Sequence, residues 1–157
     1  MPQPTATITA PTPATAPEFR FALRVYWEDT DAGGVVYYAN YLKFFERART
    51  EWLRASGCQQ EKLRLESGVV FVVADASVRY LQPARLDDLI DVTLQLRHAG
   101  RAQMTVAQQA WRRADTDDTR ATLLAEATIR VGCVDAGTFR PQRIPTAVSR
   151  SLNSPAA

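Results

Sequence analysis

The chain has 157 residues, enough for one domain with a hydrophobic core; 46% of them are hydrophobic and 23% are charged. The formal net charge of +2 gives no reason to expect binding to nucleic acid or to an anionic membrane surface. No apolar run approaches the ~20 residues needed to cross a bilayer, so we expect a globular protein that neither spans a membrane nor binds nucleic acid.

Cysteine and histidine usage argues against a metal centre. Cys58 and Cys133 are far apart, in no spacing typical of metal ligands, and His98 is the single histidine. Two unpaired thiols fit a reducing compartment. We therefore expect a cytoplasmic protein without a bound metal ion.

The two ends of the chain differ in composition from its middle. Residues 1–17 are rich in proline, threonine and alanine, show no periodic pattern, and lack the basic start and apolar core of a secretory signal. We predict a disordered tail over residues 1–17, one domain over residues 18–145, and a flexible C-terminal tail over residues 146–157.

Residues 19–28 form the first predicted strand, because hydrophobic and polar side chains alternate along them. Two aspartates, Asp29 and Asp31, follow, and on a still-extended backbone their side chains would face the same way. Gly33 and Gly34 then permit a sharp turn and a close approach of another group to the backbone.

A long amphipathic helix is predicted next, from about Tyr41 to Ser56. Asn40 is the predicted N-cap and Gly57 the predicted stop. One wide apolar face recurs mostly at three- and four-residue steps. Its members are Tyr41, Phe44, Phe45, Ala48, Trp52 and Ala55.

The remainder of the chain alternates between β-forming runs and short polar connections. A charged connector over residues 59–66 precedes predicted strands over residues 69–80, 89–97, 104–112 and 121–134. The first of these begins with a continuous apolar run, which predicts a central strand covered on both faces. One strand, one long helix and four strands with short connections predict an α+β fold, with an antiparallel sheet covered by the helix.

Three segments carry a resemblance to a known family. They are RVYWEDTDAGGVVYYANYLKFFERARTEWLR (24–54), PARLDDLIDV (83–92) and VGCVD (131–135). Together they resemble the hotdog-fold acyl-CoA thioesterases, most closely the Tol-Pal-associated and 4-hydroxybenzoyl-CoA thioesterase group. The resemblance implies a curved antiparallel sheet of about five strands wrapped around one long helix.

The resemblance places the catalytic carboxylate at Asp31. This group either attacks the thioester carbonyl and forms an anhydride or acts as a general base on water, and the residues do not choose between the two. The implied oxyanion donor is the backbone N–H of Tyr38 at the start of the helix, with Gly34 letting the acyl group approach. Asp29 competes for the catalytic role, and we expect it to be a supporting group.

Contacts to coenzyme A are implied at Arg97 and Arg101. Both flank the predicted turn at 98–100, and guanidinium groups suit phosphates. A solvated hairpin tip is the alternative interpretation of this pair.

One position departs from the Tol-Pal-associated pattern. That branch commonly has histidine after Val-Val-Tyr, where this chain has Tyr38, and tyrosine is a poor base at pH 7. The 4-hydroxybenzoyl-CoA branch resembles this chain in having an aromatic residue there, which leaves an aromatic acyl group open.

The resemblance implies cofactor-independent hydrolysis of an acyl-CoA, with acyl-carrier protein as another carrier, by a homodimer or homotetramer with sites at subunit interfaces. A hydroxyacyl dehydratase would pair a histidine with a carboxylate, and His98 lies in a predicted turn. The remaining alternative is a non-catalytic protein of the cell envelope that binds acyl-CoA or acyl-carrier protein. Tyr38 favours that alternative, and Asp31 with the glycine pair opposes it.

Overall fold

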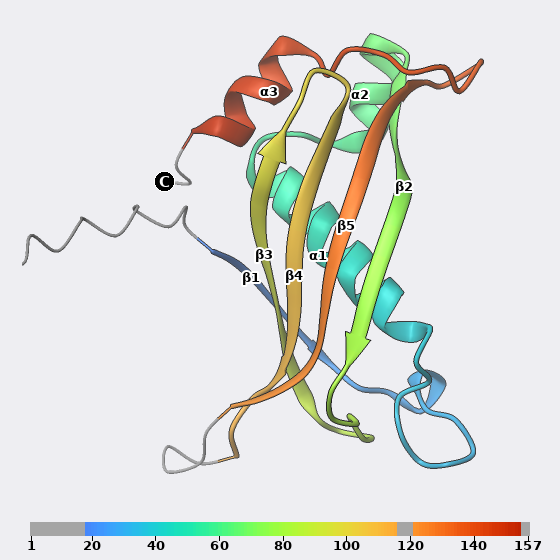
Figure 1. Cartoon of the computed structure of the whole chain (residues 1–157), viewed down its shortest axis with the longest axis vertical. Coiled ribbons are helices and arrows are strands. Elements are labelled where there is room, and N and C mark those ends of the chain that lie inside the picture. The colour runs from blue at the N-terminus through green and yellow to red at the C-terminus, as the bar shows by residue number, and fades with distance from the viewer. Residues whose placement is uncertain (1–17, 116–120, 155–157) are drawn as a thin grey trace, which may run out of the picture.

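The computed structural model describes residues 18–115 and 121–154 of the chain. Five antiparallel strands form one sheet, and a long helix crosses one of its faces (Figure 1). The elements in chain order are β1 (Phe19–Arg24), a short 3-10 helix η1 (Trp27–Asp29), α1 (Asn40–Ala55), α2 (Gln60–Ser67), β2 (Val69–Tyr80), β3 (Leu89–Ala99), β4 (Gln103–Arg112), β5 (Thr122–Asp135) and α3 (Thr146–Asn153).

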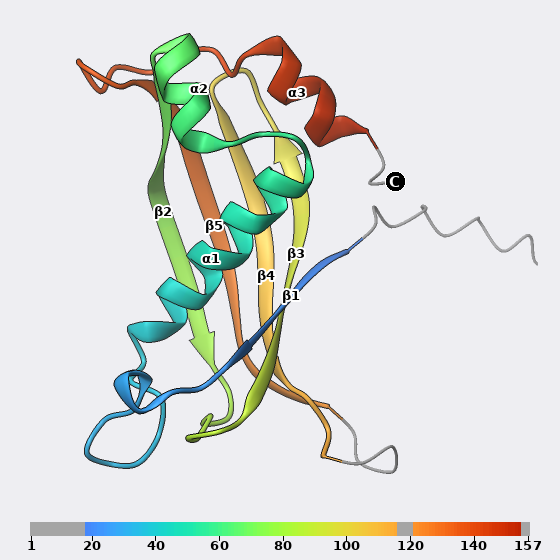
Figure 2. The same cartoon turned by 180° about the vertical axis from the view of Figure 1, so that it is seen from behind.

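The strand order across the sheet is β1-β3-β4-β5-β2. Hairpin neighbours β3, β4 and β5 form its centre, while β1 and β2 are its edges. Figure 2 shows α1 lying diagonally in front of the sheet, with α2 and α3 gathered at one end. The predicted α+β hotdog architecture is confirmed by this arrangement.

The core lies between α1 and the sheet. Phe44 and Phe45 of α1 are fully buried against side chains from the inward face of the strands. Burying a side chain of this size contributes about 2–3 kcal/mol relative to leaving it in water. The fully buried strand residues include Ile90, Val92, Leu94, Met104, Val106, Leu124 and Ile129.

A buried polar link fixes α1 on the sheet. Gln108 of β4 is 1% exposed, and its amide donates to the carbonyl of Phe45 at 2.9 Å. The guanidinium of Arg49 donates to the Gln108 side-chain oxygen, also at 2.9 Å. Because buried polar groups are costly without partners, this pairing specifies how far α1 is shifted along β4.

Three local features differ from the sequence prediction. The first strand ends at Arg24, because the carboxylate of Asp29 accepts the Tyr26 N–H at 2.8 Å and closes η1. The helix begins at Asn40, which is buried inside it and donates to the Asp29 carbonyl instead of capping. The predicted connector forms α2, which ends at Gly68 in a left-handed conformation.

Two larger expectations were wrong. The strand beginning at Val69 is not central, because β2 lies at an edge of the sheet and Val73 to Ser77 are exposed. Residues 146–153 form α3 rather than a flexible tail, since Val148 is buried in the core and Leu152 packs against it. The predicted tail at residues 1–17 lies outside the described residues.

Candidate active site

A tight loop joins β1 to α1 and presents the acidic and glycine residues singled out above. Its two legs pair with each other: the Asp31 N–H donates to the Val35 carbonyl at 2.9 Å, and the Tyr37 N–H donates to the Asp29 carbonyl at 2.9 Å. Thr30 and Val36 form an isolated antiparallel bridge between these contacts. The loop therefore holds Asp31 on one leg and the start of α1 on the other.

The carboxylate of Asp31 is exposed and points into the glycine turn. One of its oxygens accepts the Gly33 N–H at 2.8 Å. A Cβ atom at Gly33 would lie 3.1 Å from that oxygen, and Gly34 has a φ of +78°, where other residues are strained. Both glycines are therefore needed for this placement of the carboxylate.

Asp29 has a different environment from Asp31. It is 5% exposed, and both its carboxylate and its carbonyl are used inside the fold, by Tyr26, Tyr37 and Asn40. The two aspartates do not face the same way, because η1 interrupts the extended backbone between them and the first strand. Asp29 therefore supports the loop, whereas Asp31 is exposed to solvent.

The backbone at the start of α1 leaves a donor open. Within the described residues, the N–H of Tyr38 has no hydrogen-bond partner. The carbonyl of the same residue, Tyr38, accepts a hydrogen bond of 2.9 Å from the hydroxyl of Tyr80, which lies at the end of β2. An N–H at the positive end of a helix is suited to an oxyanion.

Tyrosine rings surround this helix start. The ring of Tyr80 lies edge-on to those of Tyr38 and Tyr41, with centroids 5.9 and 5.5 Å apart, and Tyr37 lies 5.0 Å from Tyr38. Burial and the neighbouring Tyr38 raise the pKa of Tyr80. Its hydroxyl therefore stays protonated at neutral pH, as a donor must.

Several aromatic side chains near the loop are uncovered. Tyr37 and Tyr38, whose ring centroids lie 5.0 Å apart, are 45% and 61% exposed. Large aromatic side chains exposed together mark a surface that contacts a ligand or another protein. This patch lies beside Asp31 on the chain.

A second feature, an apolar hollow of about 120 Å³, opens between α1, α2 and the sheet near the β2 edge. Phe71 and Val73 line it together with Trp52 and Leu53, and its polar wall includes Glu46. These residues lie along the C-terminal half of α1, away from Asp31 of the same chain. We call this feature the apolar hollow.

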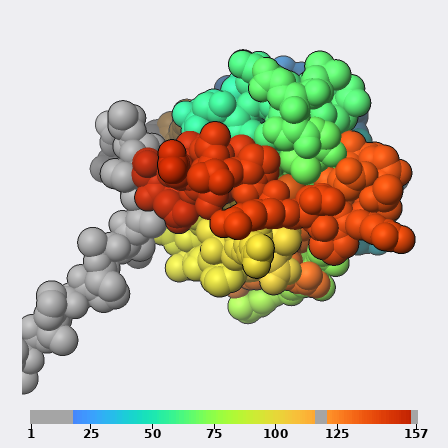
Figure 3. Space-filling model, turned by 90° about the horizontal axis from the view of Figure 1, so that it is seen from above, coloured from blue at the N-terminus to red at the C-terminus, as the bar shows by residue number. Residues whose placement is uncertain are grey.

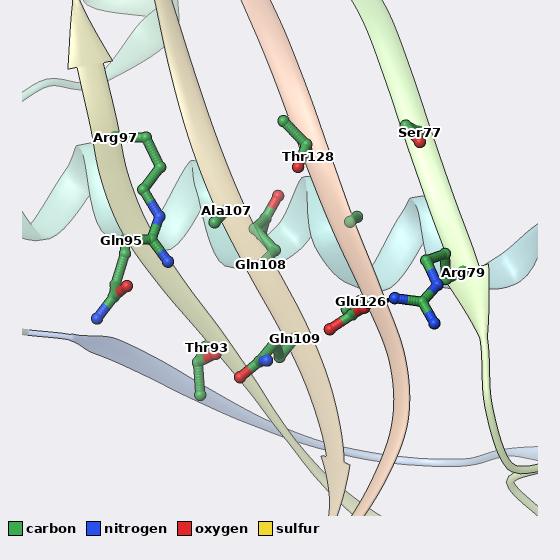
Figure 4. A pocket seen from close by; sticks show the side chains of 11 residues that line it. Ser77, Arg79, Thr93, Gln95, Arg97, Ala107, Gln108, Gln109, Glu126 and Thr128 are labelled. Atoms are coloured by element: carbon green, nitrogen blue, oxygen red, sulfur yellow. Dashed lines mark hydrogen bonds and ion pairs between the residues drawn. The ribbon is translucent and has the colours of Figure 1, made fainter.

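The two arginines expected to meet coenzyme A do not lie together. Arg97 projects from β3 on the sheet face opposite α1, where it lines a polar groove of about 300 Å³ with Gln95, Arg79 and Glu126 (Figure 4). Among these four residues, Arg79 and Glu126 form an ion pair at 2.7 Å. Arg101 lies in the β3–β4 hairpin and lines a separate hollow.

Both arginines are distant from Asp31 in one chain. The loop carrying Asp31 lies near the start of β3, because the Val25 N–H donates to the Asp88 carbonyl. Arg97 and Arg101 lie at the far end of β3, whose 11 residues extend over about 36 Å. Figure 1 shows the loop and the hairpin at opposite ends of the sheet.

Sequence reasoning missed two residues beside these sites. Tyr80 reaches the helix start only through the fold, and its position at the end of a predicted strand gives no local signal. Arg143 lines the same hollow as Arg101, but the segment around it has no periodic pattern to place it.

None of the helices in the described ranges combines the length and apolarity needed to cross a bilayer.

Comparison with known proteins identifies the family. Residues 25–152 match the family model described as the thioesterase-like superfamily.

Curated relatives and solved structures agree with this match. The acyl-CoA thioesterase YbgC of Haemophilus influenzae is 41% identical over 86% of this chain and 94% of its own length. The acyl-CoA thioester hydrolase YbgC of Escherichia coli O6:H1 is 41% identical over 83% of this chain and 92% of its own length. In fold, the chain is similar to a mutant 4-hydroxybenzoyl-CoA thioesterase solved in complex with 4-hydroxybenzoyl-CoA, with a TM-score of 0.79. The similarity covers 87% of this chain and 99% of that chain, at 16% sequence identity. This chain belongs to the thioesterase-like superfamily and has its hotdog fold.

Proposed function

We propose that this protein hydrolyses an acyl-CoA thioester to a carboxylic acid and free coenzyme A, with Asp31 as its catalytic carboxylate. The observation that carries the proposal is the loop geometry. One leg carries an exposed carboxylate, and the other carries the Tyr38 N–H, which has no partner among residues 18–115 and 121–154; a turn that requires glycine joins the two legs. Curated relatives at 41% identity are named as acyl-CoA thioesterases, which supports this substrate class.

Two chemical roles fit the Asp31 carboxylate. As a nucleophile it attacks the thioester carbonyl, the thiolate of coenzyme A leaves, and water then hydrolyses the resulting anhydride. As a general base it takes a proton from a water molecule that attacks the carbonyl directly. Both routes consume one water and release the acid and the thiol.

In both routes negative charge develops on the carbonyl oxygen. The Tyr38 N–H, with the dipole of α1 behind it, stabilises that charge. Gly34 leaves the approach to this position open because it has no side chain. Tyr38 itself supplies an aromatic ring where a histidine would supply a base, so proton transfer does not depend on an imidazole at this position.

A complete site requires a second copy of the chain. Beyond the described pairing with β5, the other edge of β2 is open, and its helix-side residues Val73 and Tyr80 are 51% and 45% exposed. Antiparallel pairing of two β2 strands across a two-fold axis would cover these apolar side chains. It would also pair an edge strand that could otherwise promote aggregation.

This pairing also brings together the two separated features. Tyr80, at the end of β2, contacts Tyr38, whereas Phe71 and Val73, near its start, line the apolar hollow. An antiparallel β2 pair sets the end of one strand beside the start of the other. The Asp31 loop of one copy would then lie beside the apolar hollow of its partner, which would take the acyl group.

A dimer is therefore the smallest unit that we propose to be active, and two dimers pairing through sheet faces would give a tetramer. We place the enzyme in the cytoplasm, because both cysteines are unpaired and buried. Burial raises the pKa of both thiols, which keeps them protonated and unreactive.

The experiment that tests the function is thiol release from a panel of aliphatic and aromatic acyl-CoA thioesters by the wild-type protein. We expect turnover of at least one acyl class, with loss of the thioester matched by release of thiol. Hydrolysis rates for the preferred acyl group on coenzyme A, on pantetheine and on acyl-carrier protein are then compared to identify the preferred carrier. Binding of acyl-CoA without release of thiol from any panel member would instead establish a non-catalytic acyl-binding protein.

A further inference from the structure

A short turn follows β5 and extends past the open edge of β2. In Figures 1 and 2 the segment over residues 136–140 reaches beyond β2, away from the other strands. Figure 3 looks onto this end of the molecule and shows an orange lobe on the side away from α3. The Ala136 N–H donates to the Gly68 carbonyl at 2.9 Å, and Val69, the first residue of β2, pairs with Asp135. The segment is therefore attached to the start of β2, and we call residues 136–140 the overhanging turn.

The overhanging turn is closed by the side chain and the backbone of Asp135. One carboxylate oxygen accepts the Gly137 N–H at 3.0 Å, the Thr138 N–H at 2.7 Å and the Thr138 hydroxyl at 3.0 Å. The Phe139 N–H donates to the Asp135 carbonyl at 2.9 Å, and the Asp135 N–H donates to the Arg140 carbonyl at 2.8 Å. The hydrogen bonds to its carboxylate, with that from the Thr138 N–H first, lower the pKa of Asp135. The carboxylate therefore stays ionised at neutral pH and holds the turn in one shape.

Phe139, in this turn, combines exposure with an unusual backbone conformation. It is 64% exposed, and its φ is +58°, in the left-handed region. A bulky residue seldom adopts this region, where glycine is free of strain. Within residues 18–115 and 121–154, its ring belongs neither to the hydrophobic core nor to an aromatic pair. A strained and exposed aromatic residue on a rigid turn indicates a contact outside the chain.

Phe139 is far from Asp31 of its own chain. The overhanging turn lies at the start of β2, whereas the loop that carries Asp31 lies at the end of β2, where the Tyr80 hydroxyl donates to the Tyr38 carbonyl. The 12 residues of β2 extend over about 36–40 Å. The Phe139 ring therefore reaches no catalytic group of its own chain.

The proposed antiparallel pairing of two β2 strands removes this distance. It sets the start of β2 in one copy beside the end of β2 in the other, so that the overhanging turn would reach the partner's helix start. Tyr37 and Tyr38 at that helix start are 45% and 61% exposed, with ring centroids 5.0 Å apart. Aromatic rings that meet edge-on or offset attract one another beyond the effect of the area that they bury. An uncovered phenylalanine on one copy thus matches uncovered tyrosines on the other.

We propose that Phe139 of one copy packs against Tyr37 and Tyr38 of its partner and holds the Tyr38 N–H in place as the oxyanion donor. Phe139 is then a positioning residue supplied by the second copy, and each active site contains Asp31 from one chain and Phe139 from the other. Because Asp135 closes the turn, the ring is held in position before the two copies meet. This inference rests on the proposed function and on the proposed pairing of two β2 strands.

Cross-linking tests the contact without requiring activity. Unlabelled full-length protein with the photo-cross-linker p-benzoylphenylalanine at position 139 is refolded together with isotope-labelled wild type, irradiated and digested with trypsin. We expect cross-links from position 139 to a labelled peptide of residues 25–43, which contains both tyrosines. Cross-links to the unlabelled chain alone, or none to residues 25–43, overturn the contact.

The same cross-linker at position 142 is the matched control. Gln142 is also exposed, but its N–H donates to the Cys133 carbonyl at 2.9 Å, which keeps it on β5. We expect no cross-link from this position to residues 25–43. An equal yield from both positions would mean that the copies meet without a defined contact at Phe139, which also overturns the inference.

Kinetics test whether the contact positions the oxyanion donor. Phe139→Gly removes the ring and also relieves the left-handed φ, so its thermal unfolding midpoint should equal or exceed that of the wild type. We expect its kcat on the preferred acyl-CoA to fall about threefold to tenfold, the range of one aromatic contact, with KM close to the wild-type value. Phe139→Tyr, which keeps an aromatic ring, and Gln142→Ala should both match the wild type. An unchanged kcat in Phe139→Gly overturns the positioning role.

Mixed dimers show which chain supplies the ring. Asp31→Asn removes the carboxylate, and Phe139→Asp places an unpaired charge among the partner's tyrosines, so each variant alone should retain only a small fraction of wild-type activity. Random pairing of equal amounts gives mixed dimers with one doubly defective site and one intact site, so activity should recover to about a quarter of wild type. If Phe139 acted within its own chain, both sites of a mixed dimer would be defective, and the absence of recovery would overturn the inference. A wild type that hydrolyses no thioester contradicts the proposed function separately, while the cross-links still decide the contact.

Discussion

Tyr80 is the side chain that fixes the proposed oxyanion donor from another part of the chain. Its hydroxyl holds the carbonyl of Tyr38 at 2.9 Å, while its ring lies against Tyr38 and Tyr41. Because the Tyr38 N–H and carbonyl belong to one residue, holding the carbonyl limits how far the N–H can rotate. We therefore interpret Tyr80 as a positioning residue.

Tyr80→Phe should lower kcat about threefold to tenfold and leave KM within twofold. The ring contacts remain, and the lost hydrogen bond is of the size that contributes about 1 kcal/mol net. Steady-state kinetics on the preferred acyl-CoA measure this, with Tyr26→Phe as an exposed-tyrosine control that should match wild type. If the Tyr80 variant is less stable to heat but has an unchanged kcat, the hydroxyl has only a structural role.

At the residue scale, sequence predicts what one loop contains. Asp31, Gly34 and Tyr38 belong to one contiguous motif, so a resemblance carries all three together. Tyr80 is 42 residues from Tyr38, and only the sheet brings it to α1. The separation of Arg97 from Arg101 was also not predictable, because a hairpin turn at 98–100 does not specify which sheet face each side chain takes.

Elements with strong periodicity were the most predictable. The predicted helix and five strands all exist, with β2 at the predicted residues 69–80. The prediction of a central position for β2 was wrong because a continuous apolar run fits an edge strand as well as a strand covered on both faces. The proposed pairing with a second copy would cover this edge. The short helix α3 was missed because Val148 and Leu152 alone make its apolar face.

Val148→Ala tests whether α3 is a packed element. Removing two buried methyl groups should lower the free energy of unfolding by about 2 kcal/mol, and chemical denaturation measures this. Ala147→Ser, one residue away on the exposed side, should change stability by less than about 0.5 kcal/mol. Equal, negligible effects of both substitutions would mean that the segment from residue 146 behaves as a tail.

At the scale of the whole molecule, the open edge of β2 connects folding to function. The single chain leaves apolar side chains uncovered along this edge and places the apolar hollow far from Asp31. The proposed antiparallel pairing of two β2 strands would cover these side chains and bring the apolar hollow of one copy beside Asp31 of the other. We therefore predict that activity and assembly are lost together.

Val73→Arg should convert the proposed dimer to a monomer and lower kcat/KM at least tenfold, because a buried unpaired charge would face the partner strand. Light scattering coupled to size-exclusion chromatography gives the assembly state. Thr128→Arg, on the sheet face away from α1, should leave the dimer intact and would disrupt a tetramer that forms through that face. A wild-type protein that is monomeric and fully active would show that the site is complete within one chain.

The hydrolysis rate of Asp31→Asn on the preferred acyl-CoA tests directly whether Asp31 is the catalytic carboxylate. The substitution preserves size and can still accept the Gly33 N–H, but it removes the carboxylate. Glu28→Gln is the matched control, because Glu28 is an exposed acid in the same loop. We predict that Asp31→Asn lowers kcat about 10²- to 10⁴-fold with an unchanged unfolding midpoint, and that Glu28→Gln retains activity. Turnover of Asp31→Asn within a few fold of wild type would contradict the account and assign the chemistry to another group.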